Sequence, residues 1–255
     1  MNGVGIDAAR GRVAIITGAG SGLGRALAVA LAAHGWRLAL VGRRTERLLE
    51  TRELCETCAA CLAIPADVTA PAAPGEIVGA TLAAFGRLDA LVNNAGLARF
   101  ARLETADLDD LDRMFRTNLV APAALIDHAV PALRSARGTV VNVGSIGGVL
   151  AMPGRAYYGA TKAALSHLTR SLARELAPDV RVNAVLPGAI DTEMYDDLGL
   201  DAEQVASLRA DMVRTTPLGR MGSPGEVVPW IEMLLGPAGA WVTGSLIVID
   251  GGRSC

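Results

Sequence analysis

The sequence predicts an α/β fold, a doubly wound parallel sheet of seven strands with helices on both faces. Short, continuous apolar runs alternate with longer helix-like runs along the whole chain. Such runs are typical of parallel strands buried on both faces. The 255 residues are 51% hydrophobic and 20% charged, which allows a substantial core. We therefore expect one domain over residues 1–255.

Each strand is expected where apolar and β-branched residues run together and end at a turn. The predicted strands are 12–17, 37–42, 61–68, 88–96, 138–145, 180–188 and 244–252. The helices predicted between them are 22–35, 44–58, 75–86, about 107–134 and 156–177. No linker or repeat interrupts this order. The stretch 189–221 is predicted to be an insertion that covers the substrate, because long loops are uncommon unless they are functional or disordered.

The charge balance excludes some partners. The formal net charge is −2 and the estimated pI is 5.9, which gives no reason to expect nucleic acid or an anionic membrane as partner. No apolar run reaches membrane-spanning length, and the first residues lack the apolar core of a signal peptide. We expect a cytoplasmic protein.

Three of the four cysteines, Cys55, Cys58 and Cys61, recur at every third position. This spacing is similar to metal or iron–sulfur runs, but a tetrahedral site needs four ligands, and the remaining cysteine is the distant Cys255. We interpret the three as small apolar fillers on a helix and the next strand, and we expect no metal.

A glycine-rich turn follows the first predicted strand and opens the first helix. It reads TGAGSGLG from Thr17 to Gly24. Glycines allow a tight turn and close approach of the backbone to a pyrophosphate, which then lies at the helix N-terminus. The spacing Gly18-x-x-x-Gly22-x-Gly24 departs from G-x-G-x-x-G, and a turn without a ligand is the alternative.

The only lysine of the chain, Lys162, lies in a predicted helix with two adjacent tyrosines. Residues four apart share a helix face, which pairs Lys162 with Tyr158. Tyr157 is five residues away, or about 140° around the helix axis. An ammonium group favours the phenolate, and lysine is a compact point charge that arginine does not replace equivalently. We therefore predict that Tyr158 and Lys162 act together.

Two further polar residues could complete a site. Ser145 follows the fifth predicted strand, at the sheet edge where open α/β sheets bind ligands; an ordinary loop serine is the alternative. Asn118 lies four residues before Pro122 in the long helix. Because proline has no N–H, the Asn118 carbonyl loses its helical donor and could bind water. A simple proline kink is the alternative.

Together these motifs resemble the short-chain dehydrogenase/reductase family, and the resemblance covers nearly the whole chain. It is carried by the following elements: the turn Thr17–Gly24, Asp67–Val68, Asn93–Gly96, Asn118, Ser145, the Tyr158-x-x-x-Lys162 pair, and Pro187–Thr192. The resemblance implies a Rossmann-type fold and a catalytic tetrad. In it Tyr158 is the general acid/base, Ser145 polarises the carbonyl, Lys162 binds the nicotinamide ribose, and Asn118 completes a proton relay through water.

The second predicted strand indicates which nucleotide binds. An acidic residue at its end would accept a hydrogen bond from the ribose 2′-hydroxyl, but Gly42 stands there, followed by Arg43 and Arg44. Arginine can hold a 2′-phosphate bidentately, which favours NADP(H); the alternative is that both arginines begin a solvated helix. The cofactor contacts we expect are Thr17, Gly18, Gly20, Ser21, Gly22, Leu23, Gly24, Arg43, Arg44, Asp67, Val68, Asn94, Ala95, Gly96, Tyr158, Lys162, Pro187, Gly188, Ile190 and Thr192.

The predicted insertion indicates the character of the substrate. Its apolar residues predict an apolar wall; they are Met194, Tyr195, Leu198, Leu200, Leu208 and Met212. Its first half is acidic, with no basic residue before Arg209, which argues against a highly anionic, carrier-bound substrate. A solvated acidic face explains the same pattern equally well.

We therefore interpret the chain as an NADP(H)-dependent oxidoreductase acting on a small carbonyl compound or secondary alcohol. The alternatives are an oxidative NAD-dependent alcohol dehydrogenase and a non-catalytic nucleotide-binding regulatory protein. The family usually pairs its two long helices between subunits, and apolar residues lie on more than one face of the helices predicted here. We expect a homotetramer, with a homodimer as the alternative.

Overall fold

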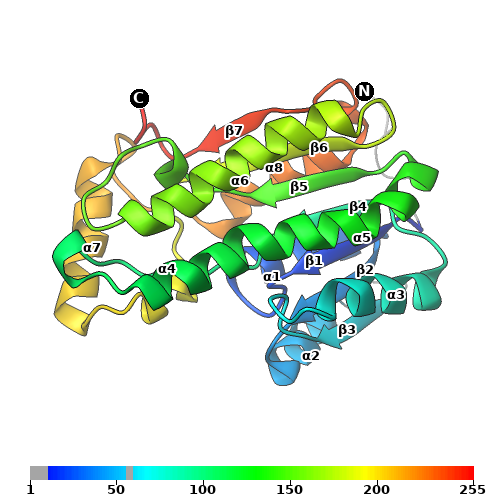
Figure 1. Ribbon diagram of the computed structural model, residues 1–255, viewed down its shortest axis with the longest axis horizontal. Coiled ribbons are helices and arrows are strands. Elements are labelled where there is room, and N and C mark those ends of the chain that lie inside the picture. The colour runs from blue at the N-terminus through cyan, green and yellow to red at the C-terminus, as the bar shows by residue number, and fades with distance from the viewer. Residues whose placement is uncertain (1–10, 56–59) are drawn as a thin grey trace.

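The computed structural model describes residues 11–55 and 60–255. In these residues seven strands form one parallel sheet in the order β3-β2-β1-β4-β5-β6-β7 (Figure 1). This is the predicted doubly wound sheet, and its order reverses between β1 and β4. The strands are β1 Val13–Thr17, β2 Arg37–Gly42, β3 Cys61–Pro65, β4 Ala90–Asn93, β5 Thr139–Val143, β6 Arg181–Pro187 and β7 Leu246–Ile249.

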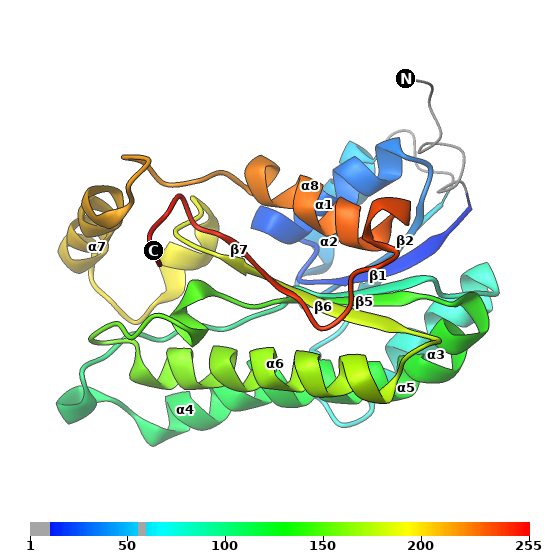
Figure 2. The same ribbon diagram turned by 90° about the horizontal axis from the view of Figure 1, so that it is seen from above.

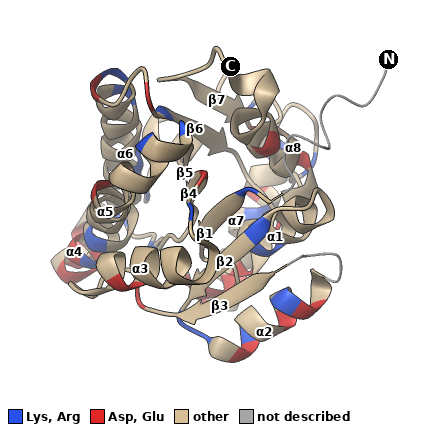
Figure 3. Cartoon of the chain, turned by 90° about the vertical axis from the view of Figure 1, so that its right-hand side faces the viewer, with Lys and Arg blue, Asp and Glu red and all other residues tan. Residues whose placement is uncertain are grey.

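Helices cover both faces of the sheet. Figure 2 shows α1, α2 and α8 on one face and α3, α4, α5 and α6 on the other. The helices are α1 Gly22–Ala33, α2 Thr45–Leu54, α3 Ala73–Phe85, α4 Leu108–Phe115, α5 Ala121–Ala136, α6 Ala156–Glu175, α7 Ala202–Thr215 and α8 Pro224–Leu235. Charged residues of both signs alternate along the exposed helix α2 (Figure 3).

The apolar core lies in two layers, one on each face of the sheet. Along β1, Val13 and Ile15 belong to the layer that includes α3 and α5, whereas Ala14 and Ile16 belong to the layer that includes α1 and α8. All four side chains are fully buried. Successive side chains of a strand point to opposite faces, so a strand covered on both sides must be apolar at every position.

The predicted helix at about 107–134 contains a break in its hydrogen-bond pattern. A π-helical segment, Arg116–Val120, joins α4 to α5 and contains Asn118. Pro122 follows at the start of α5 and cannot donate to the carbonyl four residues before it. Insertion of a π turn is a common way to accommodate such a gap, and π turns occur frequently at functional sites.

The stretch 189–221 contains a helix that the sequence analysis did not predict. After the 3₁₀ segment Glu193–Asp197, helix α7 begins with a capping box in which Asp201 and Gln204 each bond the other's backbone N–H. The Asp-x-x-Gln spacing was a usable signal for this helix. Helix α7 lies beyond the carboxyl ends of the strands (Figures 1 and 2).

Two further findings concern the described residues alone. Within residues 11–55 and 60–255, no helix is long and apolar enough to cross a membrane.

Of the three clustered cysteines, Cys55 caps α2 and Cys61 begins β3, whereas Cys58 lies outside the described residues. The described residues contain no group of three or more metal-ligand side chains, and the absence of a bound metal stays a prediction.

Candidate active site

The glycine turn after β1 has a backbone that only glycine tolerates. Gly18 and Gly22 have positive φ values of 66° and 50°, a region that L-residues with side chains rarely adopt. A Cβ added at Gly24 would lie 2.3 Å from the Gly18 carbonyl oxygen. The first turn of α1 contains no acidic residue, and Ser21 makes no side-chain cap bond there. This N-terminus therefore suits an anion such as a pyrophosphate.

Two predicted residues hold this turn against the neighbouring strand. The Thr17 hydroxyl accepts hydrogen bonds from the backbone N–H groups of Asn94 (3.0 Å) and Ala95 (2.9 Å). The Asn94 side-chain amide donates in return to the Thr17 carbonyl at 2.8 Å. These bonds join the ends of β1 and β4, where the strand order reverses. Thr17 and Asn94 therefore fix the glycine turn against the segment that follows β4.

A cleft of about 340 Å³ opens over this crossing point. It begins at the glycine turn, passes the ends of β2 and β3, and reaches the segment after β4. Its lining residues are Gly18, Gly20, Ser21, Gly42, Arg43, Arg44, Arg47, Leu48, Ala66, Asp67, Val68, Thr69, Ala95, Gly96, Leu97, Arg113, Arg116 and Thr117. The predicted contacts from the first four strands thus meet at one place.

Five arginines and one carboxylate line the cleft. Three of these arginines, Arg47, Arg113 and Arg116, pair with carboxylates outside the lining, so the positive charge is concentrated at Arg43 and Arg44. Arg43 forms no ion pair within the described part of the chain, and Arg44 has only a 3.7 Å contact with Glu193. Asp67 accepts hydrogen bonds from the Thr69 backbone N–H and hydroxyl, which lower its pKa. A dinucleotide with several phosphate charges fits this surplus of positive charge.

Tyr158 and Lys162 lie on the same face of α6, and Lys162 is next to Gly96, which lines the cleft. Both are buried, and the Lys162 ammonium nitrogen is 5.9 Å from the centre of the Tyr158 ring. The ammonium donates to the Val143 carbonyl at 2.9 Å. A Cβ added at Gly96 would lie 3.6 Å from this nitrogen, so the ammonium faces the cleft where glycine leaves room.

Burial sets the pKa values of both groups. It lowers the pKa of Lys162 to about 8 and raises the pKa of Tyr158. The expected lowering of the Tyr158 pKa by Lys162 is not found. The groups that lower it are a hydrogen bond with Ser145 and then the charge of Arg155, and neither offsets the burial of the phenol. In this structure Tyr158 is therefore a neutral phenol near pH 7.

Ser145 lies directly after β5, as predicted. Its hydroxyl accepts a hydrogen bond from the Gly147 backbone N–H at 3.1 Å, which caps a short 3₁₀ turn. A Cβ added at Gly147 would lie 3.3 Å from the Tyr158 ring and 3.4 Å from the Ser145 hydroxyl. The two hydroxyl groups are thus neighbours that could donate to one substrate oxygen.

The Asn118 side chain joins three segments of the site. Its oxygen accepts from the Leu97 N–H at 2.8 Å, and its amide donates to the Leu97 carbonyl at 2.8 Å and to the Thr161 hydroxyl at 3.0 Å. Thr161 in turn donates to the Tyr158 carbonyl. Because all of these partners are protein groups, the side chain holds the segment after β4 against α6.

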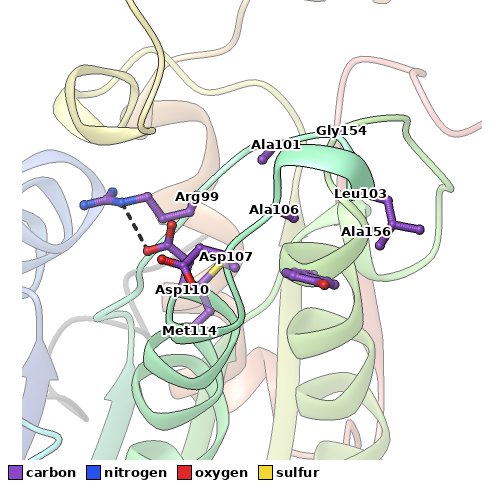
Figure 4. A pocket seen from close by; sticks show the side chains of 10 residues that line it. Arg99, Ala101, Leu103, Ala106, Asp107, Asp110, Met114, Gly154 and Ala156 are labelled. Atoms are coloured by element: carbon purple, nitrogen blue, oxygen red, sulfur yellow. Dashed lines mark ion pairs between the residues drawn. The ribbon is translucent and has the colours of Figure 1, made fainter.

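The adjacent Tyr157 lies in different surroundings. It lines a small pocket beside the start of α4 with Asp110 and Met114, and Arg99 lies 3.9 Å from Asp110 there (Figure 4). The pocket has a volume of about 20 Å³, which is room for about one water molecule. Tyr158 therefore lies on the helix face of Lys162, whereas Tyr157 faces the small pocket beside α4.

The predicted contacts after β6 are divided between two places. Thr192 lies against the glycine turn, because a Cβ added at Gly22 would be 3.3 Å from its methyl group. Pro187 is buried at the end of β6, and Gly188 packs against Asp250. Ile190 instead lines a separate cavity of about 230 Å³ beneath α8. Leu23 packs on the core.

Sequence reasoning missed Arg47, Arg113 and Arg116, which line the cleft. Arg47 follows the predicted Arg44 by three residues, so the shared helix face was a usable signal. Arg113 and Arg116 come from α4 and the π turn. No local pattern distinguishes them from other exposed helix arginines, and only the placement of α4 brings them to the cleft.

Comparisons with known proteins give matches along nearly the whole chain. The family model described as enoyl-(acyl carrier protein) reductase matches residues 18–254. A rhamnolipids biosynthesis 3-oxoacyl-acyl-carrier-protein reductase from Pseudomonas aeruginosa is 35% identical over 249 residues, covering 95% of this chain and 96% of that protein.

Solved structures agree with this match. Levodione reductase superposes with a TM-score of 0.91 at 34% identity, covering 96% of this chain and 98% of that one. The 3-ketoacyl-(acyl-carrier-protein) reductase from Brucella melitensis, complexed with NADH, gives a TM-score of 0.87 at 30% identity, with 97% and 100% coverage.

Proposed function

The chain belongs to the short-chain dehydrogenase/reductase family and is an oxidoreductase, and from this premise we propose that it is an NADP(H)-dependent carbonyl reductase. The observation that carries the proposal is the neutral, buried Tyr158 phenol beside the Ser145 hydroxyl. A protonated phenol is the form that gives a proton to a developing alkoxide. The same phenol would accept a proton in the oxidative direction, so an oxidative alcohol dehydrogenase is the alternative.

Each residue of the proposed tetrad has a distinct task. The bound cofactor supplies the hydride, and Tyr158 gives the proton to the carbonyl oxygen. Ser145 donates a hydrogen bond to the same oxygen, which holds it and stabilises its developing charge. Lys162 would hold a ribose hydroxyl of the cofactor with its ammonium group, which the Val143 carbonyl positions beside the cleft. Asn118 positions the segment after β4 and connects the site to a relay through water.

The choice of NADP(H) rests on the charge of the cleft at the end of β2. Gly42 leaves no carboxylate there to repel a 2′-phosphate, and Arg43 is exposed without an ion pair among the described residues. Arg47 lies on the same side of the cleft and adds a further guanidinium. Guanidinium groups match phosphate oxygens in a planar, bidentate way.

A homotetramer, with a homodimer as the alternative, is proposed from the outer faces of the helices on one side of the sheet. Val120 is 56% exposed in the π turn, and Ala163 is exposed on α6. The opposite faces of these helices already pack on the sheet, so the outer faces are available to a symmetric neighbour. We also propose that residues 1–255 act as one domain with a small-molecule carbonyl or alcohol substrate.

Initial rates of NADPH oxidation with a panel of ketones test the proposal. Tyr158→Phe should lower kcat/KM by several orders of magnitude and leave NADPH binding intact, because only the acidic hydroxyl is removed. Tyr157→Phe is the matched control and should retain substantial turnover. Lys162→Arg should be badly impaired although it keeps the charge. Equal losses in both tyrosine variants would contradict the assignment, and unimpaired binding with no turnover in the wild type would favour a regulatory protein.

A further inference from the structure

Arg155 lies close to the proposed catalytic tyrosine, and a second arginine far away in the sequence, Arg253, lies close enough to Arg155 to lower its pKa. Arg155 immediately precedes α6, and its guanidinium carbon is 4.9 Å from the centre of the Phe100 ring. That ring meets the Tyr158 ring edge-on at 5.6 Å. Arg155 donates to the Met152 sulfur at 3.0 Å and forms no ion pair with a carboxylate among the described residues. Its charge is therefore held close to the site without an acidic partner.

Arg253 approaches the same place from the chain end after β7. Its side chain is only 7% exposed, and its ion pair with Asp211 spans 3.6 Å, which is too long for a direct hydrogen bond. Asp211 is bonded more closely to Arg214, whose side chain is 75% exposed. Within residues 11–55 and 60–255, the Arg253 guanidinium donates no hydrogen bond that would compensate its burial. A buried charge in this state is costly unless a partner binds it.

The charges of these groups influence one another's pKa values. After burial, the charge of Arg253 is the next cause that lowers the pKa of Arg155. Tyr195, on the 3₁₀ segment before α7, has its pKa raised to about 12, first by burial and then by Tyr158, while both arginines act in the opposite direction. Tyr195 is therefore a neutral phenol, able to donate a hydrogen bond, and it packs in the same buried group as Tyr158.

The surroundings of the cluster are apolar. Tyr158, Tyr195, Met212 and Ala189 belong to one buried apolar group that joins α6 to α7. Charge interactions are stronger in such surroundings than in water. Asp211 offsets part of the charge of the two arginines, which leaves a surplus suited to a singly charged anion rather than to a phosphate ester with two charges.

We propose that Arg155, Arg253 and Tyr195 bind the carboxylate of the substrate, so that the enzyme reduces oxo carboxylic acids. The proposal rests on the proposed function, because it places this carboxylate beside the carbonyl that Tyr158 protonates. The guanidinium groups supply planar donor pairs for the two carboxylate oxygens, and Tyr195 adds a third donor. The acidic first half of the insertion argued against a highly anionic, carrier-bound substrate, and a singly charged acid agrees with that expectation. Both arginines come from segments outside the insertion.

A structural role for Arg253 is the competing explanation, since its ion pair with Asp211 joins the chain end to α7. The chain offers a matched control for this alternative. Arg214 also pairs with Asp211 but points into solvent. Arg253→Gln and Arg214→Gln each remove one guanidinium group that pairs with Asp211. Only Arg253→Gln also removes a guanidinium group from the proposed anion site.

The experiment compares straight-chain 2-, 3-, 4- and 5-oxo acids with their methyl esters, using NADPH and the wild type, Arg253→Gln, Arg155→Gln and Arg214→Gln. We expect the wild type to prefer at least one acid over its ester. Arg253→Gln and Arg155→Gln should each lower kcat/KM for that acid by about tenfold to a hundredfold, mainly through KM. Arg253→Gln should leave the ester unchanged, whereas Arg155→Gln should also slow the ester, though less than the acid, because the Arg155 charge lowers the pKa of Tyr158. Arg253→Lys should recover part of the loss.

A wild type that prefers every ester would overturn the proposal, as would equal losses for acid and ester in both glutamine variants. A binding measurement separates this outcome from failure of the proposed function. Butanoate, but not butanamide, should raise the Tm of the wild type and of Arg214→Gln, and should have no effect on Arg253→Gln. If no ketone is reduced, the carbonyl reductase is refuted, and the butanoate shift still decides whether the anion site exists.

Discussion

Replacing Lys162 by methionine should alter the pH dependence of stability in a way that can be calculated from the structure. Burial lowers the pKa of this ammonium from 10.5 to about 8. Since one pKa unit corresponds to about 1.4 kcal/mol, charging Lys162 in the folded chain at pH 7 costs about 3 kcal/mol relative to the unfolded chain. Methionine removes this cost while keeping a long apolar side chain.

The direction of this pH dependence follows from the number of protons that the folded and unfolded chains bind. The folded pKa lies below the unfolded one, so between pH 8 and 10.5 the unfolded chain binds more protons, and the stability contribution of Lys162 rises with pH. Lys162→Met lacks this rise. Its advantage over the wild type should be largest below pH 8 and should shrink by about 2 kcal/mol between pH 7 and 9.5. Loss of the donor to the Val143 carbonyl reduces the advantage at every pH by a similar amount.

Urea unfolding of both proteins at several pH values from 7 to 9.5 measures this difference. Arg174→Met, at an exposed position of the same helix, is the control and should show a difference from wild type that does not vary with pH. Lys162→Met should also lose turnover, so stability and activity would change in opposite directions. A Lys162→Met advantage that is constant across this range would show that Lys162 is hydrated, and the reasoning from burial would be wrong.

Two further predictions concern the cofactor and the assembly. Wild-type kcat/KM should favour NADPH over NADH by about tenfold to a hundredfold, because a hydrogen bond to a charged group contributes about 1.5–3 kcal/mol; Gly42→Asp combined with Arg43→Ala should reverse this preference in initial-rate assays. If the double mutant kept the wild-type ratio of kcat/KM for NADPH and NADH, another part of the chain would select the cofactor. Light scattering at micromolar concentration should give the mass of a tetramer, and replacing the exposed Val120 by glutamate should lower it; a wild-type monomer would refute the assembly.

Much of the fold and part of the site followed from local patterns. The alternation of apolar runs predicted the parallel sheet, because a strand covered on both faces must be apolar at each position. The four-residue spacing selected Tyr158 over Tyr157, because the period of a helix is a local property. Helix α7 was missed although Asp201 and Gln204 form a capping box, because the acidic stretch before them was interpreted as part of a loop.

Contacts between distant segments could not be predicted in this way. The direction of the Tyr158 pKa shift was expected wrongly, because burial depends on how completely α6 and the 3₁₀ segment with Tyr195 enclose the phenol. Arg113 and Arg116 reach the cofactor cleft only because α4 packs beside it.

The sequence by itself thus determined the sheet, the glycine turn after β1 and the placement of Tyr158 with Lys162 on one helix face, since each depends on spacing within one strand, turn or helix. The tertiary structure alone decided which charges surround the proposed carboxylate site. Arg155 and Arg253 are separated in sequence by two strands and three α-helices, and they come close only because the chain end after β7 returns toward the start of α6. Electrostatic interactions depend on distance in space and on burial, and neither quantity is written in the local order of residues.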